Sequence, residues 1–375
     1  MTSMNTVANQ RWKALAAHRL FWPVAVLLAL LVANVIYRPS FLSIELLQGH
    51  LYGSLIDIVR LSAPLILVAL GMTLVIATGG IDLSVGSVVA ICGAIACLRI
   101  SQQSDQNSVG GVLSALAVAM VLSLVLGAWN GLLVAGIGIQ PIIATLLLMV
   151  AGRGLAQLIT SGQIITINSS PYKLIGAGFW LTLPFAIFIA VAVTVVAALV
   201  TRRTALGMLI EAVGGNAEAS RLAGIRSRRF IFTVYVFSAF CAGIAGFMIT
   251  SNVSSADGNS AGLWIELDAI LAVVIGGTSL AGGRFSIGGT ILGALIIQTL
   301  TTTVYSINIT PQTSLLFKAL VVIIVCLVQS PAFRASLAHR FRRAAPRPPA
   351  PPGPTSPDAP VAEIAVEETP MEVQR

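Results

Sequence analysis

The sequence predicts an all-α polytopic membrane protein of about ten transmembrane helices, some of them broken or re-entrant. Of its 375 residues, 56% are hydrophobic and only 10% are charged, whereas soluble domains carry about 25% charged residues. The apolar residues form long runs rather than an alternating pattern, which favours helices over barrel strands. The 34 glycines suit helices that pack closely in lipid.

The apolar runs give the individual spans in chain order. The first follows a basic segment and is not followed by a convincing cleavage site in "VANVIYRPS", so we expect a retained helix rather than a signal peptide. Several later runs are short or broken by glycine, which leaves the count between about nine and eleven. The expected spans are 20–36, 56–78, 83–98, 112–137, 142–159, 181–200, 230–250, 265–280, 287–304 and 315–328.

The basic residues orient these spans. With the N-terminus in the cytoplasm, sixteen of the 22 Lys and Arg residues fall in cytoplasmic segments, and only Arg38 and Lys173 fall on the opposite side. This bias predicts that both termini are cytoplasmic. The sixteen are Arg11, Lys13, Arg19, Arg202, Arg203, Arg221, Arg226, Arg228, Arg229, Arg284, Arg334, Arg340, Arg342, Arg343, Arg347 and Arg375.

The same pattern divides the chain into three parts. Residues 1–19 form a basic cytoplasmic N-terminus, and residues 20–330 form the transmembrane domain, which includes a large cytoplasmic segment at 201–229. Residues 331–375 are Pro-rich and then acidic without apolar periodicity, so we expect a disordered cytoplasmic tail.

Several function classes lack their characteristic residues. None of the three lysines follows a Gly-x-x-x-x-Gly pattern, so no phosphate-binding loop is predicted. The three histidines lie outside the spans, and the four cysteines lie inside apolar runs without ligand spacing. The basic residues cluster at helix ends rather than along one face, which is a topological pattern and not one of nucleic-acid binding. We therefore predict no enzyme, no metal, no cofactor and no nucleic-acid partner.

The spans contain few polar groups, and these are the candidates for a substrate pathway. Asp57 and Arg60 are three residues apart and are expected to form a structural ion pair on one helix face. Asn130 is equally able to bond freed backbone or to touch substrate. The tentative pathway residues are Asp82, Ser84, Asn130, Thr145, Arg153, Gln157, Glu266, Asp268, Thr278 and Ser279.

Asp82 lies in "GGIDLSVG", between two apolar runs and without a nearby basic residue. Gly79 and Gly80 can leave the helix, and Asp82 is then a good N-cap for a helix that re-enters the membrane from the cytoplasmic side. The motif aligns with "GGTSLAGG" at an offset of 197, which matches Gly79 with Gly276. Paired glycine interruptions of this kind are typical of transporters with internal repeats and broken helices.

The cytoplasmic segment predicts a short helix at 216–222 with Asn216 as its N-cap. Glycines at 214, 215 and 224 punctuate its two ends. Such a helix is suited to dock on a soluble partner, and an ordinary amphipathic interfacial helix is the alternative.

Four segments resemble the hallmark segments of bacterial ABC importer permeases of the ribose, xylose and arabinose type, in the branched-chain amino acid and sugar permease superfamily. They are "ALGMTLVIATGGIDLSVGSVVAI", "IQPIIATLLLMVAGRGLAQLI", "ALGMLIEAVGGNAEASRLAGI" and "LWIELDAILAVVIGGTSLAGGRFSIGG". Within that group, "TSGQIITINSSPY" and "NSAGLWIELDAILAVVIGG" are most similar to the galactofuranose permeases. The resemblance covers about residues 20 to 330 and departs at Ser220, where many members have alanine.

The resemblance implies a permease subunit of the bacterial inner membrane that imports a monosaccharide, with galactofuranose or a related sugar expected. It implies three partners: a second permease subunit, identical or paralogous, a periplasmic sugar-binding protein and a cytoplasmic ABC ATPase that hydrolyses ATP. The region that meets the ATPase is implied to include Glu211, Gly215, Asn216, Ala219 and Gly224.

The alternative is an ion- or proton-coupled secondary transporter. That mechanism needs carboxylates that titrate within the membrane. Asp82, Glu266 and Asp268 instead lie near glycine breaks or span ends, which favours the ATP-driven permease.

Overall fold

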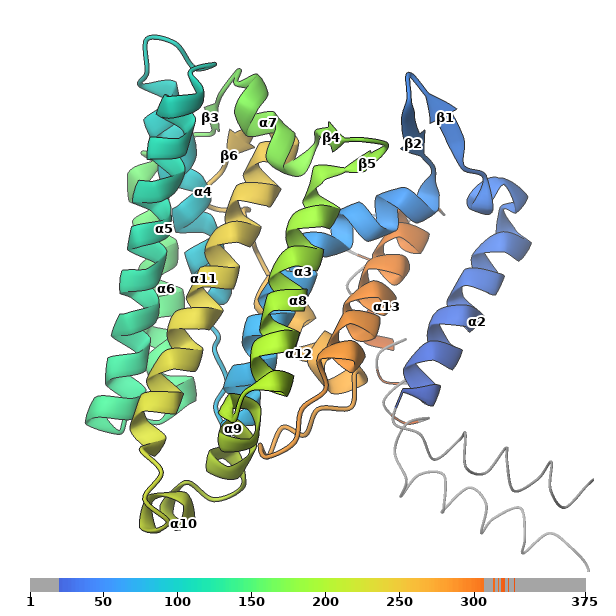
Figure 1. The fold of residues 1–375 in the computed structure, drawn as a ribbon. Coiled ribbons are helices and arrows are strands. Elements are labelled where there is room, and N and C mark those ends of the chain that lie inside the picture. Colours follow the sequence, from blue (N-terminus) through green and yellow to red (C-terminus); the bar gives the residue numbers. More distant parts are fainter. Residues whose placement is uncertain are drawn as a thin grey trace, which may run out of the picture. The chain divides into compact units, whose positions relative to one another are not determined.

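A computed structural model describes residues 20–306 together with 313, 316, 318–320, 323 and 327. Within these residues the chain forms a bundle of long helices (Figure 1), of which six are long and apolar enough to cross a membrane. The principal helices are α2 (Phe21–Tyr37), α3 (Ser54–Ala77), α4 (Val85–Ser101), α5 (Val109–Gly131), α6 (Pro141–Ile159), α8 (Phe185–Arg203), α11 (Ser227–Val253), α12 (Ile265–Ile275) and α13 (Ile287–Ser306).

These helices correspond to the first nine expected spans. Most of the tenth, 315–328, lies outside the described residues, as do the two predicted terminal segments, 1–19 and 331–375. Two boundaries in the expected spans were wrong. The span expected at 181–200 begins only at Phe185 because a short hairpin precedes it, and the span expected at 265–280 ends at Ile275, where a glycine pair follows.

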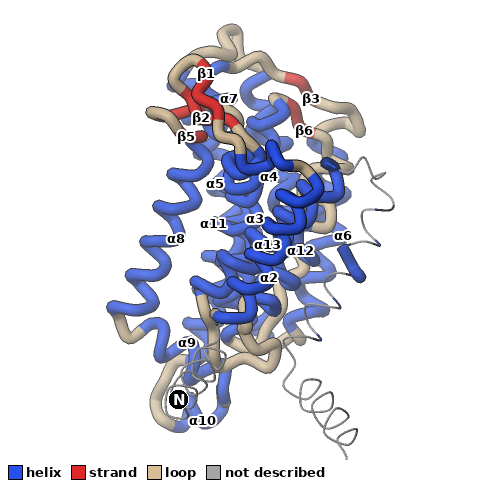
Figure 2. The backbone as a smooth tube through the Cα atoms, turned by 90° about the vertical axis from the view of Figure 1, so that its right-hand side faces the viewer, coloured by secondary structure: helices blue, strands red, loops and turns tan. Residues whose placement is uncertain are grey.

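Short strands gather at one end of the bundle and two small helices at the other (Figures 1 and 2). The strands pair as β1 (Glu45–Leu47) with β2 (His50–Tyr52), β3 (Ile165–Thr166) with β6 (Ser255–Ala256), and β4 (Phe179–Trp180) with β5 (Leu183–Pro184). The 3-10 turn η1 (Pro39–Leu42) and helix α7 (Ser170–Gly176) lie at the same end. The opposite end carries α9 (Leu206–Gly215) and α10 (Ala217–Leu222).

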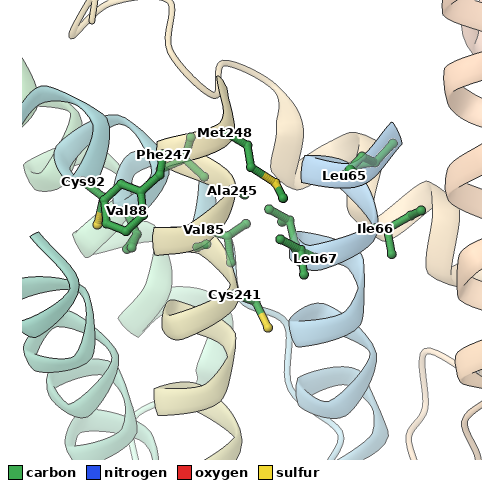
Figure 3. Packing of buried hydrophobic residues seen from close by; sticks show 14 of the residues in the cluster. Leu65, Ile66, Leu67, Val85, Val88, Cys92, Cys241, Ala245, Phe247 and Met248 are labelled. Carbon is green, nitrogen blue, oxygen red and sulfur yellow. The ribbon is translucent and has the colours of Figure 1, made fainter. Parts of the chain in front are cut away.

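Helix α11 is the centre of the bundle and packs against α3, α4 and α5. Small residues permit the close approach: a side chain on Gly71 would meet the backbone of Ser238, and one on Gly246 would meet the carbonyl of Val89. The space between these helices is filled by a cluster of apolar side chains (Figure 3), which includes Val85, Cys241 and Met248. Cys92 and Cys97 are buried in the same cluster as free thiols, as expected for packing residues.

The last turns of the fourth span are π-helical. The segment η2 (Leu132–Ile137) continues α5, and Gly138 then adopts a left-handed conformation with φ of 86°. Pro141 occupies the first turn of α6, where its missing N–H costs nothing.

Candidate functional site

Two helices begin in the interior of the bundle instead of at its ends. Helix α12 has 11 residues, fewer than the roughly 20 needed to cross a membrane, and α4 has 17, at the lower limit of that length. Their first turns meet, because a side chain on Gly86 in α4 would collide with Glu266 of α12 and with the carbonyl of Gly262. Two half-helices with their N-termini together form the interrupted arrangement that transporters use to place polar groups at mid-depth.

The glycine pairs end α3 and α12 with the same turn. Gly79 and Gly277 both have φ of 83°. The following amides bond to carbonyls three residues before each helix's C-cap: Gly80 to Val75 at 3.1 Å and Thr278 to Val273 at 3.2 Å. These are matching Schellman caps. Gly79 therefore corresponds to Gly277, an offset of 198, which corrects the alignment of Gly79 with Gly276.

Asp82 is buried at the interrupted end of α4, with 2% of its surface exposed. Its Oδ1 accepts the backbone N–H of Ser84 at 3.0 Å and the Ser84 hydroxyl at 2.6 Å, and its Oδ2 accepts the Ser238 hydroxyl at 2.9 Å. Ser238 lies near the middle of the 27-residue α11, which puts Asp82 inside the bundle.

The expectation that Asp82 is the N-cap at the cytoplasmic side was therefore wrong in two respects. The helix starts at Val85 with Ser84 at the N-cap position, and the carboxylate lies at depth. The physical reason is that residues 78–84 form a non-helical connection between α3 and α4. This connection places the Asp82 carboxylate beside α11, where Ser238 donates to it. The carboxylate is satisfied by one backbone donor and two hydroxyls, which offset the cost of its burial.

Asn130 and Thr145 extend this polar cluster to α5 and α6. The Asn130 side-chain amide donates to the Ser84 hydroxyl at 2.8 Å, and the Thr145 hydroxyl donates to the Ile81 carbonyl at 3.2 Å. Asn130 Oδ1 is buried without a hydrogen-bond partner among the described residues, and so is the hydroxyl of Tyr235. Tyr235 and Ser238 were missed, although their spacing of three on an apolar span would have placed both on one helix face.

A second group joins α6 to the loop before α12. Arg153 donates to the carbonyls of Ala261 at 2.7 Å and Gly258 at 3.3 Å, and Gln157 donates to Asn259 at 2.7 Å. Glu266 is 3% exposed, and its Oε2 has no hydrogen-bond partner within the described part of the chain. This group holds the loop against α6 beside the meeting point of the half-helices.

A cleft of about 320 Å³ opens beside α12, within the range of small-molecule sites. Its polar side chains are Arg60 of α3, Asn252 of α11, Ser260 of the loop before α12, Asp268 of α12 and Gln298 of α13. Apolar residues form the remaining wall: Leu61, Pro64, Leu65, Ala186, Met248, Ile249, Val253, Leu263 and Ile265.

Both charges in the cleft are already paired. Arg60 contacts Asp57 at 3.1 Å, which confirms the expected ion pair, and Arg60 also donates to Asn252 at 3.3 Å. Asp268 contacts Lys318 at 2.8 Å. The cleft therefore offers donors and acceptors without a net charge, which suits a neutral solute rich in hydroxyl groups.

The predicted pathway residues thus fall into separate places. Asp82, Ser84 and Asn130 lie together, with Thr145 beside them; Arg153, Gln157 and Glu266 form the second group, and Asp268 lines the cleft. Thr278 and Ser279 are in the turn after α12, where their hydroxyls accept the amides of Ser286 at 3.3 Å and Ala281 at 3.2 Å. That turn belongs to the end of the bundle that carries α9.

The segment expected to meet an ATPase forms α9 and α10. Asn216 is the N-cap of α10 as expected, its side chain accepting the amide of Ala219 at 2.9 Å. Glu218 and Arg221 pair at 2.6 Å on the exposed face, and this bond holds the pKa of Glu218 below its ordinary value. Leu222 is 76% exposed, an apolar side chain available for a partner.

Helix α9 packs directly against the end of α3 and against Gly282 and Gly283 in the segment that follows α12. A side chain on Gly214 would meet the carbonyl of Ala77 at the end of α3 and the amide of Gly283 after α12. The Gly283 amide itself donates to the Ala77 carbonyl at 3.0 Å. The two interrupted helix pairs and α9 therefore meet at one junction.

A helical membrane bundle with two half-helices and a neutral polar cleft defines a membrane permease. The chain belongs to the family described as "Branched-chain amino acid transport system / permease component", which matches residues 54–326. It is accordingly a multi-pass transport component rather than an enzyme.

Three relatives show what the chain is similar to. It is 49% identical over 321 residues to the galactofuranose transporter permease protein YtfT of Escherichia coli K12, covering 84% of this chain and 92% of that protein. It is 40% identical to the fructose import permease protein FruF of Bifidobacterium longum, covering 90% and 95%. It is 35% identical to the ribose import permease protein RbsC of Haemophilus influenzae, covering 82% and 91%. No solved structure gives a significant match.

Proposed function

We propose that this chain is the membrane-spanning subunit of an ATP-driven importer for a neutral monosaccharide, galactofuranose or a closely related sugar. The observation that carries the substrate class is the cleft beside α12, whose charged residues are each neutralised by a partner while amide and hydroxyl-binding groups remain. A sugar presents hydroxyls to such groups and its C–H surface to the apolar wall. The three similar permeases are named for galactofuranose, fructose and ribose.

The proposal includes an orientation and three partners. The end with α9 and α10 is cytoplasmic, supported by the basic residues of 202–229 and Arg284 that belong to it. A cytoplasmic ABC ATPase docks there, and a periplasmic sugar-binding protein meets the end with the short strands. A second permease subunit, identical or paralogous, completes the transporter.

Gln298 offers the sharpest test of the cleft. It lines the cleft, and its side chain makes no hydrogen bond to another described residue, so Gln298→Leu keeps the side-chain size while removing the amide's NH2 donors and carbonyl acceptor. We expect about tenfold weaker uptake of the cognate sugar, equal to the loss of one hydrogen bond, with normal protein abundance. Uptake is measured in proteoliposomes with the ATPase and the binding protein.

Gln163→Leu makes the same chemical change on an exposed turn and serves as the control. Equal effects of the two substitutions would contradict the cleft as the sugar site. Uptake of a sugar phosphate at the rate of the neutral sugar would contradict the substrate class.

The docking proposal predicts a loss of coupling without a loss of folding. Gly215 and Ala219 are exposed, and a side chain built on Gly215 meets no atom within 4 Å. Gly215→Leu with Ala219→Trp therefore leaves the permease intact but obstructs the partner, and we expect ATP-driven uptake to fall by about tenfold or more. Co-purification of the ATPase and uptake are measured together, with Ala281→Trp, an exposed site at the same end, as control. Undiminished co-purification would place the docking surface elsewhere.

A further inference from the structure

A groove of about 400 Å³ lies on the outside of the bundle, where the fourth span ends and α11 begins. Its floor and walls are formed by Leu132, Ala135 and Gly136 of the π-helical turn and by Phe232 and Thr233 of α11. Arg228 and Arg229 line the same groove. The lower ends of α5 and α11, which flank it, lie side by side (Figure 1).

The sequence positions of these residues put the groove at the membrane boundary. Leu132 to Gly136 fall in the last turns of the candidate span Val109–Ile137, and the two arginines fall in the first turn of the span Ser227–Val253. Gly131 lets the helices touch just above the groove, since a side chain there would press on Phe232. The π-helical turn, whose backbone is wider than that of an α-helix, follows Gly131 and contributes Leu132, Ala135 and Gly136 to the groove.

The groove has an apolar part and a basic part. Leu132 is 52% exposed and Phe232 is 37% exposed on the apolar side, which would be costly to leave in water. Arg228 and Arg229 are exposed, and neither has a carboxylate within ion-pair distance in the part of the chain that is described. Two unpaired cations lie at the membrane boundary, and the apolar part of the groove lies on their membrane side. This arrangement matches an anionic lipid headgroup and its acyl chain.

We propose that this groove is a binding site for one anionic phospholipid, with its phosphate on Arg228 and Arg229 and an acyl chain along Leu132 and Phe232. The site is separate from the sugar cleft, and it adjoins the segment that leads from α10 into α11. Arginine is suited to it because its guanidinium bonds two phosphate oxygens at once.

The test compares two arginine pairs at the same end of the bundle. Arg202 and Arg203 end α8 and are exposed, but they do not line this groove. The full-length chain is purified in detergent and titrated with phosphatidylglycerol, and retained lipid is counted by native mass spectrometry. We expect Arg228→Gln with Arg229→Gln to weaken binding about 30-fold, at about 1 kcal/mol for each arginine. Because Arg202 and Arg203 do not line the groove, we expect Arg202→Gln with Arg203→Gln to change binding by less than about 1 kcal/mol.

Two further arms separate a lipid from other ligands. Gly136→Leu keeps both arginines but fills the slot, because only the Leu132 side chain lies near the new group, and we expect it to weaken phosphatidylglycerol as well. Competition by glycerol phosphate as strong as that of the whole lipid would overturn the proposal in favour of a free phosphate. Three other results would also overturn the proposal. They are equal binding of phosphatidylcholine, equal effects of both arginine pairs, and unchanged lipid binding in Arg228→Gln with Arg229→Gln when that variant loses ATPase co-purification.

Discussion

Asp82→Leu is expected to destabilise the permease by about 3–5 kcal/mol and to remove most of it from the membrane. The carboxylate accepts three hydrogen bonds from Ser84 and Ser238. Leucine accepts none, so three buried donors lose their partner at about 1–3 kcal/mol each before relaxation. Membrane abundance and thermal melting in detergent measure the effect.

Asp82→Asn is the informative companion because its amide can reproduce all three bonds. Its oxygen accepts both bonds from Ser84, and its NH2 group donates to the Ser238 hydroxyl, which can rotate to accept. We expect a stability loss below about 1 kcal/mol and uptake that remains substantial. Asp105→Leu, at an exposed loop position, controls for loss of a carboxylate.

Other outcomes of this pair identify other roles. A stable Asp82→Asn protein that transports no sugar would contradict the structural role and indicate substrate contact. Loss of uptake together with a changed pH profile would indicate proton coupling, the mechanism that the family membership disfavours.

Gly214→Ala is expected to have the second large effect, a loss of about 3 kcal/mol or more of stability together with loss of ATP-driven uptake. The new methyl would collide with the Ala77 carbonyl and the Gly283 amide. Both are backbone atoms that bond to each other at 3.0 Å, so neither can move cheaply. The change also pushes α9 away from the end of α3 and from the segment after α12. Melting temperature and uptake are measured on the same preparations.

Gly215→Ala is the matched control, since its methyl meets no atom within 4 Å. We expect its free energy of unfolding to stay within about 1 kcal/mol of that of the unchanged protein, because alanine has a higher helix propensity than glycine. If Gly214→Ala has a normal melting temperature and normal uptake, the contact of α9 with Ala77 and Gly283 does not link α9 and α10 to the rest of the bundle in the way proposed here.

Hydropathy alone located the spans because their apolar runs are long and differ sharply from the loops. It misplaced the start of α8, since the hairpin at Phe179–Pro184 is itself apolar and only strand pairing separates it from the helix. The alignment of the two glycine motifs was also one residue out of register. Composition cannot distinguish which glycine of a pair takes the left-handed conformation, whereas the capping bonds fix it.

Individual polar residues of the candidate site were predicted from the sequence, but the contacts between them were not. Polar groups in apolar runs are conspicuous, so Asp82, Asn130 and Glu266 were identified without a structure. Their partners were not: Ser238 is 156 residues from Asp82, and serine is common in membrane helices. The cleft was not predicted, because its lining combines residues from several helices and a loop, and no local pattern encodes the relative positions of these elements.

The sequence by itself determined the class of protein, the order of its helices, the two glycine interruptions and the short helix α10 with its Asn216 cap. These features depend on residues close together in the chain, where period, capping and charge bias act locally. Only the tertiary structure decided that the two half-helices meet at Gly86 and Glu266, that α9 packs against the end of α3 and the segment after α12, and that Asp268 and Arg60 share a neutral cleft. Those contacts join segments that are far apart in the chain, and helix packing selects them only once all the spans are assembled.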